Sequence, residues 1–105
     1  MSSASLHMAG VLFIVVPTIE FGGVSLIRML VARVPGYMDN PLRRSFFTAG
    51  HAHAGVLVIL ALVALMYVDQ ADLSSGVRSL VRGTIVAAPI LMPLGFFLSM
   101  APPSR

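Results

Sequence analysis

The chain has 105 residues, of which 57% are hydrophobic and only 10% are charged. Soluble domains are roughly half apolar and a quarter charged, so this composition places the chain in a lipid bilayer. Cysteine is absent, which excludes disulfides, thiolate metal sites and cysteine nucleophiles. The net charge of +3 comes from arginines at the ends of apolar segments rather than in a stripe, so we expect no nucleic-acid partner.

Three apolar segments are long enough to cross a membrane, which takes about 20 residues per helix. They run from about His7 to Val34, from about Arg44 to Val68 and from about Val77 to Met100. The sequence therefore predicts an all-α integral membrane protein, with three transmembrane helices in an up-down arrangement. Residues 1–105 form one unit in this prediction, and membrane lipids surround it.

Short connectors join the three segments. Val34 to Pro41 is rich in Pro, Gly, Asp and Asn, a composition typical of turns. Asp69 to Gly76 joins the second segment to the third, and either Asp72 or Ser74 can cap the third helix. Neither connector can hold a catalytic domain, so we expect no catalytic residues and no enzyme that acts alone.

The arginines indicate an orientation in the cell's inner (plasma) membrane. Those near the first connector are Arg28, Arg33, Arg43 and Arg44. The second connector holds Asp69 and Asp72, although Arg78 and Arg82 follow it. Because arginine is enriched on the cytoplasmic side, the first connector is predicted to lie inside, with the amino terminus and the second connector outside.

The most distinctive motif is Gly-His-Ala-His-Ala-Gly, from Gly50 to Gly55, within the second apolar segment. Imidazoles are costly inside hydrocarbon, so His51 and His53 need a partner, a cofactor or a bound lipid. They are two residues apart and point about 200° from one another, so they cannot grip one metal ion together. The two histidines are candidate cofactor-binding residues, and an ordinary packing role is the alternative.

The small residues of this motif are Gly50, Ala52, Ala54 and Gly55. They make the helix thin enough for a neighbouring helix, or a flat macrocycle, to approach its backbone.

Glu20 interrupts the first apolar segment near its centre. A hydrogen bond between Glu20 and His53 is plausible if tilt or a kink at Pro17 brings the two level. Glu20 would then orient a ligating imidazole or relay protons with it. The alternative is a protonated carboxylic acid bonded to a carbonyl that Pro17 leaves free.

The motif resembles the His-X-His segment of haem-copper oxidase and nitric oxide reductase catalytic subunits, where one helix supplies ligands to two haems. The resemblance implies haem ligation by His51 and His53. It does not extend to catalysis, because the chain has no second histidine pair for copper and too few helices to enclose two haems. Ala49 and His53 are also spaced like the pigment-binding residues of light-harvesting antenna polypeptides. The whole chain resembles small integral membrane proteins of actinobacterial type, a similarity that implies no particular activity.

Two function classes follow. The first is a non-catalytic accessory subunit that packs within a larger respiratory, photosynthetic or monooxygenase complex, with other integral membrane subunits as partners. The alternative is a haem-, chlorin- or metal-binding membrane module that uses His51 or His53 in electron or proton transfer. The first class accounts for the short length and for the missing partner ligands.

Overall fold

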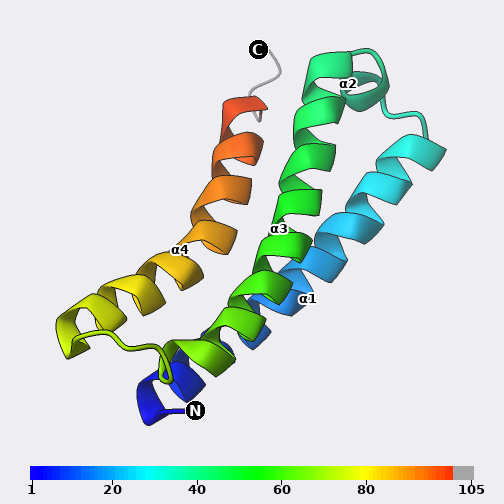
Figure 1. Cartoon of the computed structure of the whole chain (residues 1–105). Coiled ribbons are helices and arrows are strands. Elements are labelled where there is room, and N and C mark those ends of the chain that lie inside the picture. Colours follow the sequence, from blue (N-terminus) through cyan, green and yellow to red (C-terminus); the bar gives the residue numbers. More distant parts are fainter. Residues whose placement is uncertain (101–105) are drawn as a thin grey trace.

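The computed structural model describes residues 1–100, which are 87% helical and contain no strand. In chain order the elements are α1 (Ser3–Val31), the short α2 (Pro35–Met38), α3 (Pro41–Val68) and α4 (Ser75–Met100) (Figure 1). Helices α1, α3 and α4 are each long and apolar enough to span a bilayer, which confirms the predicted three-helix membrane fold. The first connector contains one extra helical turn, α2, where the sequence predicts a plain turn.

Local capping sets where the helices begin. α1 begins at Ser3, earlier than predicted, because the Ser2 hydroxyl accepts a hydrogen bond from the Ser5 N–H at 3.1 Å. α3 begins at Pro41, since a proline at the first position gives up an N–H that the helix would leave unpaired. Ser74, rather than Asp72, caps α4 by accepting a first-turn N–H at 3.3 Å.

The end of α1 carries backbone strain at Arg33, which adopts a left-handed φ of 53°. The Val34 N–H donates to the Met29 carbonyl at 3.0 Å, and the Arg33 N–H donates to the Leu30 carbonyl at 3.3 Å. This pair of bonds is a Schellman motif, in which glycine usually holds the left-handed position. An arginine there costs about 1–2 kcal/mol of backbone strain.

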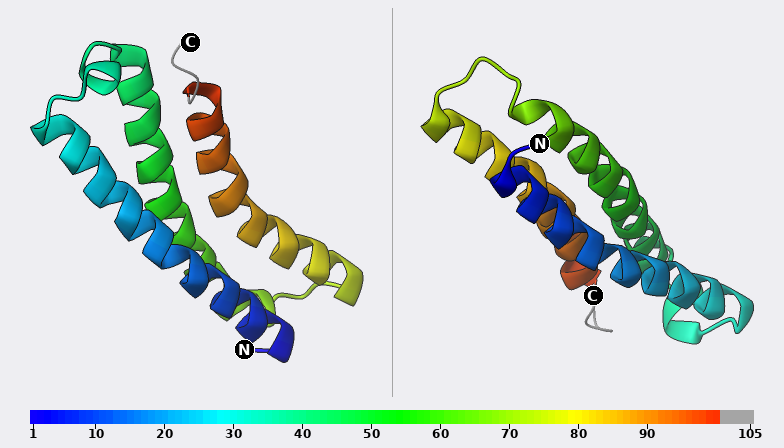
Figure 2. Two further views of the ribbon diagram at one scale, coloured as in Figure 1. Left: turned by 180° about the vertical axis from the view of Figure 1, so that it is seen from behind. Right: turned by 90° about the horizontal axis from the view of Figure 1, so that it is seen from below.

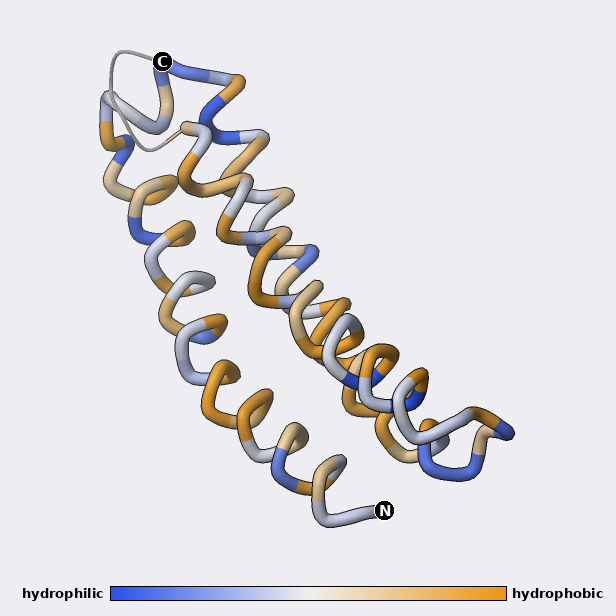
Figure 3. Tube along the Cα trace, turned by 90° about the vertical axis from the view of Figure 1, so that its left-hand side faces the viewer, coloured by the Kyte–Doolittle hydropathy of each residue, from blue (hydrophilic) through white to orange (hydrophobic). Residues whose placement is uncertain are grey.

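Helix α3 lies between α1 and α4 and packs against both, most extensively against α4, while α1 and α4 touch little (Figures 1 and 2). The Cα atoms fill 51 × 22 × 14 Å, a flat array rather than a closed bundle. Hydrophilic residues gather in the connectors at its two ends (Figure 3). Only 6% of the most apolar stretch of α1 is buried, against 28% for α3 and 22% for α4, so α1 is the most exposed span.

The packed interior is divided along the length of the array. Near the second connector an aliphatic core joins the three spans, and its buried members are Ala9, Leu12, Val58, Ala61, Leu65, Val68 and Val86. Near the first connector, rings replace aliphatic side chains, and the ring pairs are Tyr37–Phe47, Phe47–Phe97 and Phe46–Phe96. Between these regions α4 bends at the buried Pro89 and Pro93, because proline removes backbone hydrogen bonds (Figure 1).

A polar cluster holds the helix ends together beside the second connector. The Asp69 carboxylate accepts a hydrogen bond from the Ser2 N–H at 2.8 Å and pairs with Arg82 at 2.8 Å. Arg82 also donates from Nε to the hydroxyl of the fully buried Ser5 at 3.0 Å. This Asp69 cluster ties the start of α1 to the end of α3 and the first turns of α4.

Arg43 makes the corresponding connection at the opposite end. Its guanidinium donates to the Met100 carbonyl and to the Gly36 carbonyl, both at 2.8 Å. The Arg43 side chain is buried. Its two hydrogen bonds cap the end of α4 and fasten α2, and its charge adds to the positive charge near the first connector.

The Asp69 cluster predicts a pH-dependent stability. The Ser2 N–H is the largest cause that holds the pKa of Asp69 well below its usual range, and Ser5 and Arg82 act in the same direction against the opposing effect of burial. The stabilisation is therefore complete above the unfolded value of about 3.9 and is lost as pH falls from there towards the lower folded pKa. Thermal unfolding in micelles is expected to show that Asp69→Asn lowers stability at pH 7.

The gap between Asp69→Asn and wild type is expected to narrow as the pH is lowered from 4 to 2, because the carboxyl of the unfolded chain then takes up a proton more readily than the folded Asp69 carboxyl, whose pKa is lowered. The variant Asp72→Asn, which changes an exposed carboxylate in the same connector, is the matched control and stays close to wild type. A gap of the same size at pH 7 and pH 2 contradicts this role for Asp69.

Candidate functional site

His51 projects from α3 towards α1 and rests on two consecutive glycines. A Cβ atom at Gly23 would lie 3.1 Å from His51 Cε1 and 3.2 Å from Nε2, and one at Gly22 would lie 3.6 Å from Nδ1. A side chain at Gly23 would crowd the ring, so the missing Cβ lets the imidazole approach the α1 backbone. His51 lies ten residues into α3, about 15 Å from its start, which is the middle of a hydrocarbon layer of about 30 Å.

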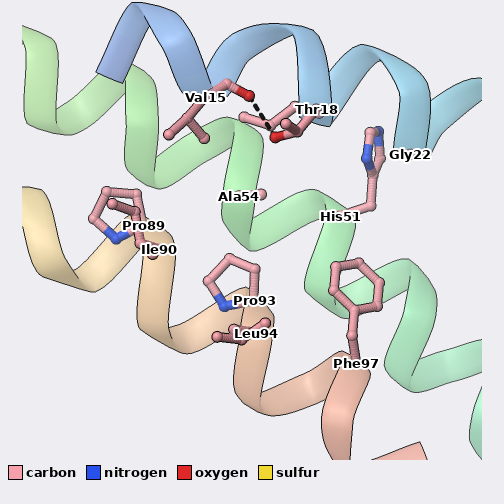
Figure 4. A pocket seen from close by; sticks show the side chains of 11 residues that line it. Val15, Thr18, Gly22, His51, Ala54, Pro89, Ile90, Pro93, Leu94 and Phe97 are labelled. Carbon is pink, nitrogen blue, oxygen red and sulfur yellow. Dashed lines mark hydrogen bonds between the residues drawn. The ribbon is translucent and has the colours of Figure 1, made fainter. Parts of the chain in front are cut away.

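An apolar cleft of about 350 Å³ opens beside this contact, between α1, α3 and α4 (Figure 4). Its lining residues are Val15, Thr18, Ile19, Gly22, His51, Ala54, Pro89, Ile90, Pro93, Leu94 and Phe97. His51 is the single titratable residue among them, and the Thr18 hydroxyl already donates to the Val15 carbonyl at 2.6 Å. The cleft suits an apolar chain or ring, with one imidazole at its edge.

His53 points away from α1, as expected for a residue two positions after His51. Its Nδ1 lies 2.7 Å from the Ala49 carbonyl oxygen, and its ring is tilted against Phe96 with centroids 5.1 Å apart. A carbonyl can only accept, so Nδ1 carries the proton, and Nε2 is left without a hydrogen bond among residues 1–100. The side chain is exposed on the surface of the array, at membrane depth.

Glu20 is also exposed, on α1, and it makes no hydrogen bond or ion pair with any residue that the structure describes. It lies about 17 Å from the end of α1 at Val31, well inside the hydrocarbon layer. The hydrogen bond suggested between Glu20 and His53 is not formed within the chain, because His53 faces away from α1. A carboxyl at this depth costs about 2.5–3.5 kcal/mol on insertion scales if it finds no partner.

The small residues of the histidine motif fall into two groups. Gly50 lies at the contact with α4, where an added Cβ would meet Phe97 at 3.0 Å and Phe96 at 3.2 Å, and Ala54 is buried beside it. Ala52 is exposed, and an added Cβ at Gly55 would meet no heavy atom within 4 Å. The first pair therefore brings α4 close, whereas Ala52 and Gly55 leave a thin, open face on α3.

The two histidines differ in their fit to a haem or a chlorin. The nitrogens of His51 face the α1 backbone, so a macrocycle bound there has no room without separating the helices. His53 has the arrangement common in metal-ligating histidines, with Nδ1 bonded to a backbone carbonyl and Nε2 free on an exposed face. Residues 1–100 contain no cluster of three or more His, Cys, Asp or Glu side chains that could hold a metal ion.

Sequence reasoning missed the residues that build the surroundings of the histidines. The contact of His51 with Gly22 and Gly23 and the cleft beside it join residues of α1, α3 and α4 that are far apart in the sequence. In the sequence, only the pair of consecutive glycines indicates a close approach to another helix. The sequence shows Asp69 in a connector and Arg82 on the next helix, but their spacing does not predict that the two side chains pair.

Comparison with protein-family models, with curated proteins and with solved structures finds no match to this chain.

The packing at Gly50 gives a direct test of the α3–α4 contact. Gly50→Ala is expected to destabilise the fold by about 1–3 kcal/mol, the usual cost of overpacking, because the new methyl group meets the Phe97 ring and the Phe96 Cβ. Gly55→Ala is the matched control, since it adds the same methyl to the same helix in open space. Denaturant titration in micelles, followed by circular dichroism, measures both, and equal stability of the two variants would show that α4 does not approach α3 here.

Proposed function

We propose that the chain is a non-catalytic structural subunit of a larger membrane assembly, in which other transmembrane helices cover the exposed face of α1. The observation that supports this most is Glu20, an exposed carboxyl at mid-membrane depth with no partner within residues 1–100. Lipid tails offer no hydrogen bond, so a partner helix is the most direct way to satisfy this group.

The shape of the unit supports the same proposal. A flat array with one span almost wholly exposed buries little of its own surface. Helices in membranes associate through close packing and interhelical hydrogen bonds rather than through hydrophobicity, and α1 offers both a carboxyl and a ridge of large side chains. The exposed large residues of that helix include Phe13, Ile14, Phe21, Val24 and Ile27.

We further propose that the assembly lies in the plasma membrane with the first connector inside the cell. Arg28, Arg33, Arg43 and Arg44 lie at or near that end of the array, whereas two arginines lie near the other. Of those two, Arg82 is paired with Asp69. The excess of arginine favours the cytoplasmic side for the first connector.

Purification from native membranes in a mild detergent tests the proposed role. The tagged wild-type chain is expected to elute in a complex of fixed stoichiometry, well above the mass of one chain. Glu20→Leu is expected to reduce the bound partner at least tenfold, which corresponds to about 1.4 kcal/mol, while Glu20→Gln retains part of it through its amide. Ile14→Leu, an exposed apolar exchange on the same helix, is the control, and a monomeric wild-type chain would contradict the proposal.

The geometry of His53 favours a second candidate function, binding of a haem or a chlorin through Nε2. His53 would hold the macrocycle on the exposed side of α3, where its ring lies. When bound, such a group supplies electron transfer or light absorption. The same preparation then shows a Soret band that His53→Ala abolishes and His51→Ala retains, and a colourless complex rules this candidate out.

A further inference from the structure

We infer that the helix covering Glu20 belongs to a second copy of this chain, whose His53 forms a hydrogen bond with the Glu20 carboxyl. This inference rests on the proposed role as a subunit of an assembly and names its partner. It is carried by the depth, the facing and the chemistry of these two residues, which are the exposed titratable groups in the middle of α1 and α3.

Glu20 and His53 lie at the same depth in the membrane. The contact of His51 with Gly22 and Gly23 fixes how α1 and α3 are aligned. Glu20 comes two to three residues before those glycines, about 4 Å along α1, and His53 comes two residues after His51, about 3 Å along α3. The two helices are antiparallel, because Ser2 at the start of α1 bonds Asp69 at the end of α3, so both steps go in the same direction. The two groups are therefore level to within about 1 Å.

The two groups cannot meet inside one chain, because they lie on different sides of it. His51 faces α1, and His53 points about 200° away round α3. Its ring lies instead against Phe96 of α4. Glu20 is exposed on α1, outside the contact that Gly22 and Gly23 make with α3. A second copy related by an axis along the membrane normal keeps every residue at its own depth, so Glu20 of one copy meets His53 of the next without any shift.

The surface beside His53 can receive a helix. A shallow groove of about 310 Å³ between α3 and α4 is lined by Phe46, Met92, Gly95, Phe96 and Ser99, and no residue of α1 belongs to it. Gly95 is exposed, with open space where a Cβ would stand. The exposed α1 residues Val24 and Ile27 lie on the first-connector side of Glu20, as the groove lies on that side of His53, and they supply side chains that fill such a groove, so the contact between copies is head to tail.

The chemistry of the pair suits a low-dielectric setting. His53 Nδ1 is held at the Ala49 carbonyl, which leaves Nε2 as the acceptor on the exposed side. A Glu20 carboxyl can donate its proton to Nε2, and the pair is neutral overall whichever of the two groups holds that proton. Both groups thereby gain a hydrogen-bond partner, which hydrocarbon cannot provide.

Cysteine cross-linking tests this contact cleanly, because the chain contains no cysteine of its own. Val24 lies one turn from Glu20, and Ala49 lies one turn from His53 towards the same membrane surface, so both native groups stay in place. Full-length Val24→Cys and Ala49→Cys chains, each with a different tag, are co-expressed and oxidised in native membranes. We expect a disulfide between the two tags, since a contact of this kind brings Cα atoms to about 7 Å or less.

Val56→Cys replaces Ala49→Cys as the matched control, because position 56 lies about 10 Å further along α3 and is exposed. Glu20→Leu and His53→Leu are each expected to reduce the specific cross-link at least fivefold, and the double Leu variant recovers part of it because no polar group is left unpaired. A Val24–Val24 cross-link in place of the mixed one overturns the inference.

The failure of this inference and that of the proposed function are distinguishable. Absence of the mixed cross-link, together with a foreign protein that co-purifies with wild type and is lost in Glu20→Leu, overturns the second-copy partner and leaves the assembly role standing. Absence of both, with a monomeric chain, overturns both proposals.

Discussion

A polar group inside hydrocarbon must find its hydrogen-bond partner in protein, and this constraint organises the whole chain. At the second connector, Asp69 gathers Ser2 and Arg82, and at the first, Arg43 donates to two backbone carbonyls. These two groups therefore find their partners within the chain. Glu20 differs from them, because its carboxyl lies in the middle of α1 and finds no partner within the described residues. Its position therefore points to contacts beyond this chain.

The two histidines of one short motif point to opposite sides of α3. His51 fits against Gly22 and Gly23 and sets the alignment of α1 with α3. His53 turns to the other side, where Phe96 and the Ala49 carbonyl hold its ring and leave Nε2 open. One imidazole thus helps to build the unit, while the other offers an acceptor to a neighbouring molecule. The cleft beside His51 is an inward feature and is separate from this outward surface.

Composition and segment length were sufficient to predict the three spans, because membrane thickness limits helix length whatever the tertiary contacts. The same reasoning could not place Glu20 relative to His53. Counting residues from the predicted helix ends at Val34 and Arg44 puts Glu20 and His53 about 8 Å apart in depth, whereas the His51–Gly23 contact makes them level. Whether Glu20 and His53 point towards one another also depends on which side of α3 packs against α1, and helical periodicity alone does not specify that side. The Asp69 cluster was not predicted because it joins residues far apart in the sequence that meet only after folding. The left-handed Arg33 was not predicted because glycine usually holds that position.

The central claim is that protein, not lipid, covers Glu20 in the native membrane. Labelling with an apolar carbodiimide tests it directly, because this reagent enters the bilayer and modifies carboxyls exposed there. The account predicts that Glu20 is protected in native membranes and becomes reactive when the chain is dissociated to monomers in detergent, as mass spectrometry of the Glu20 peptide would show. Equal labelling in both states would contradict it, since Glu20 would then face lipid.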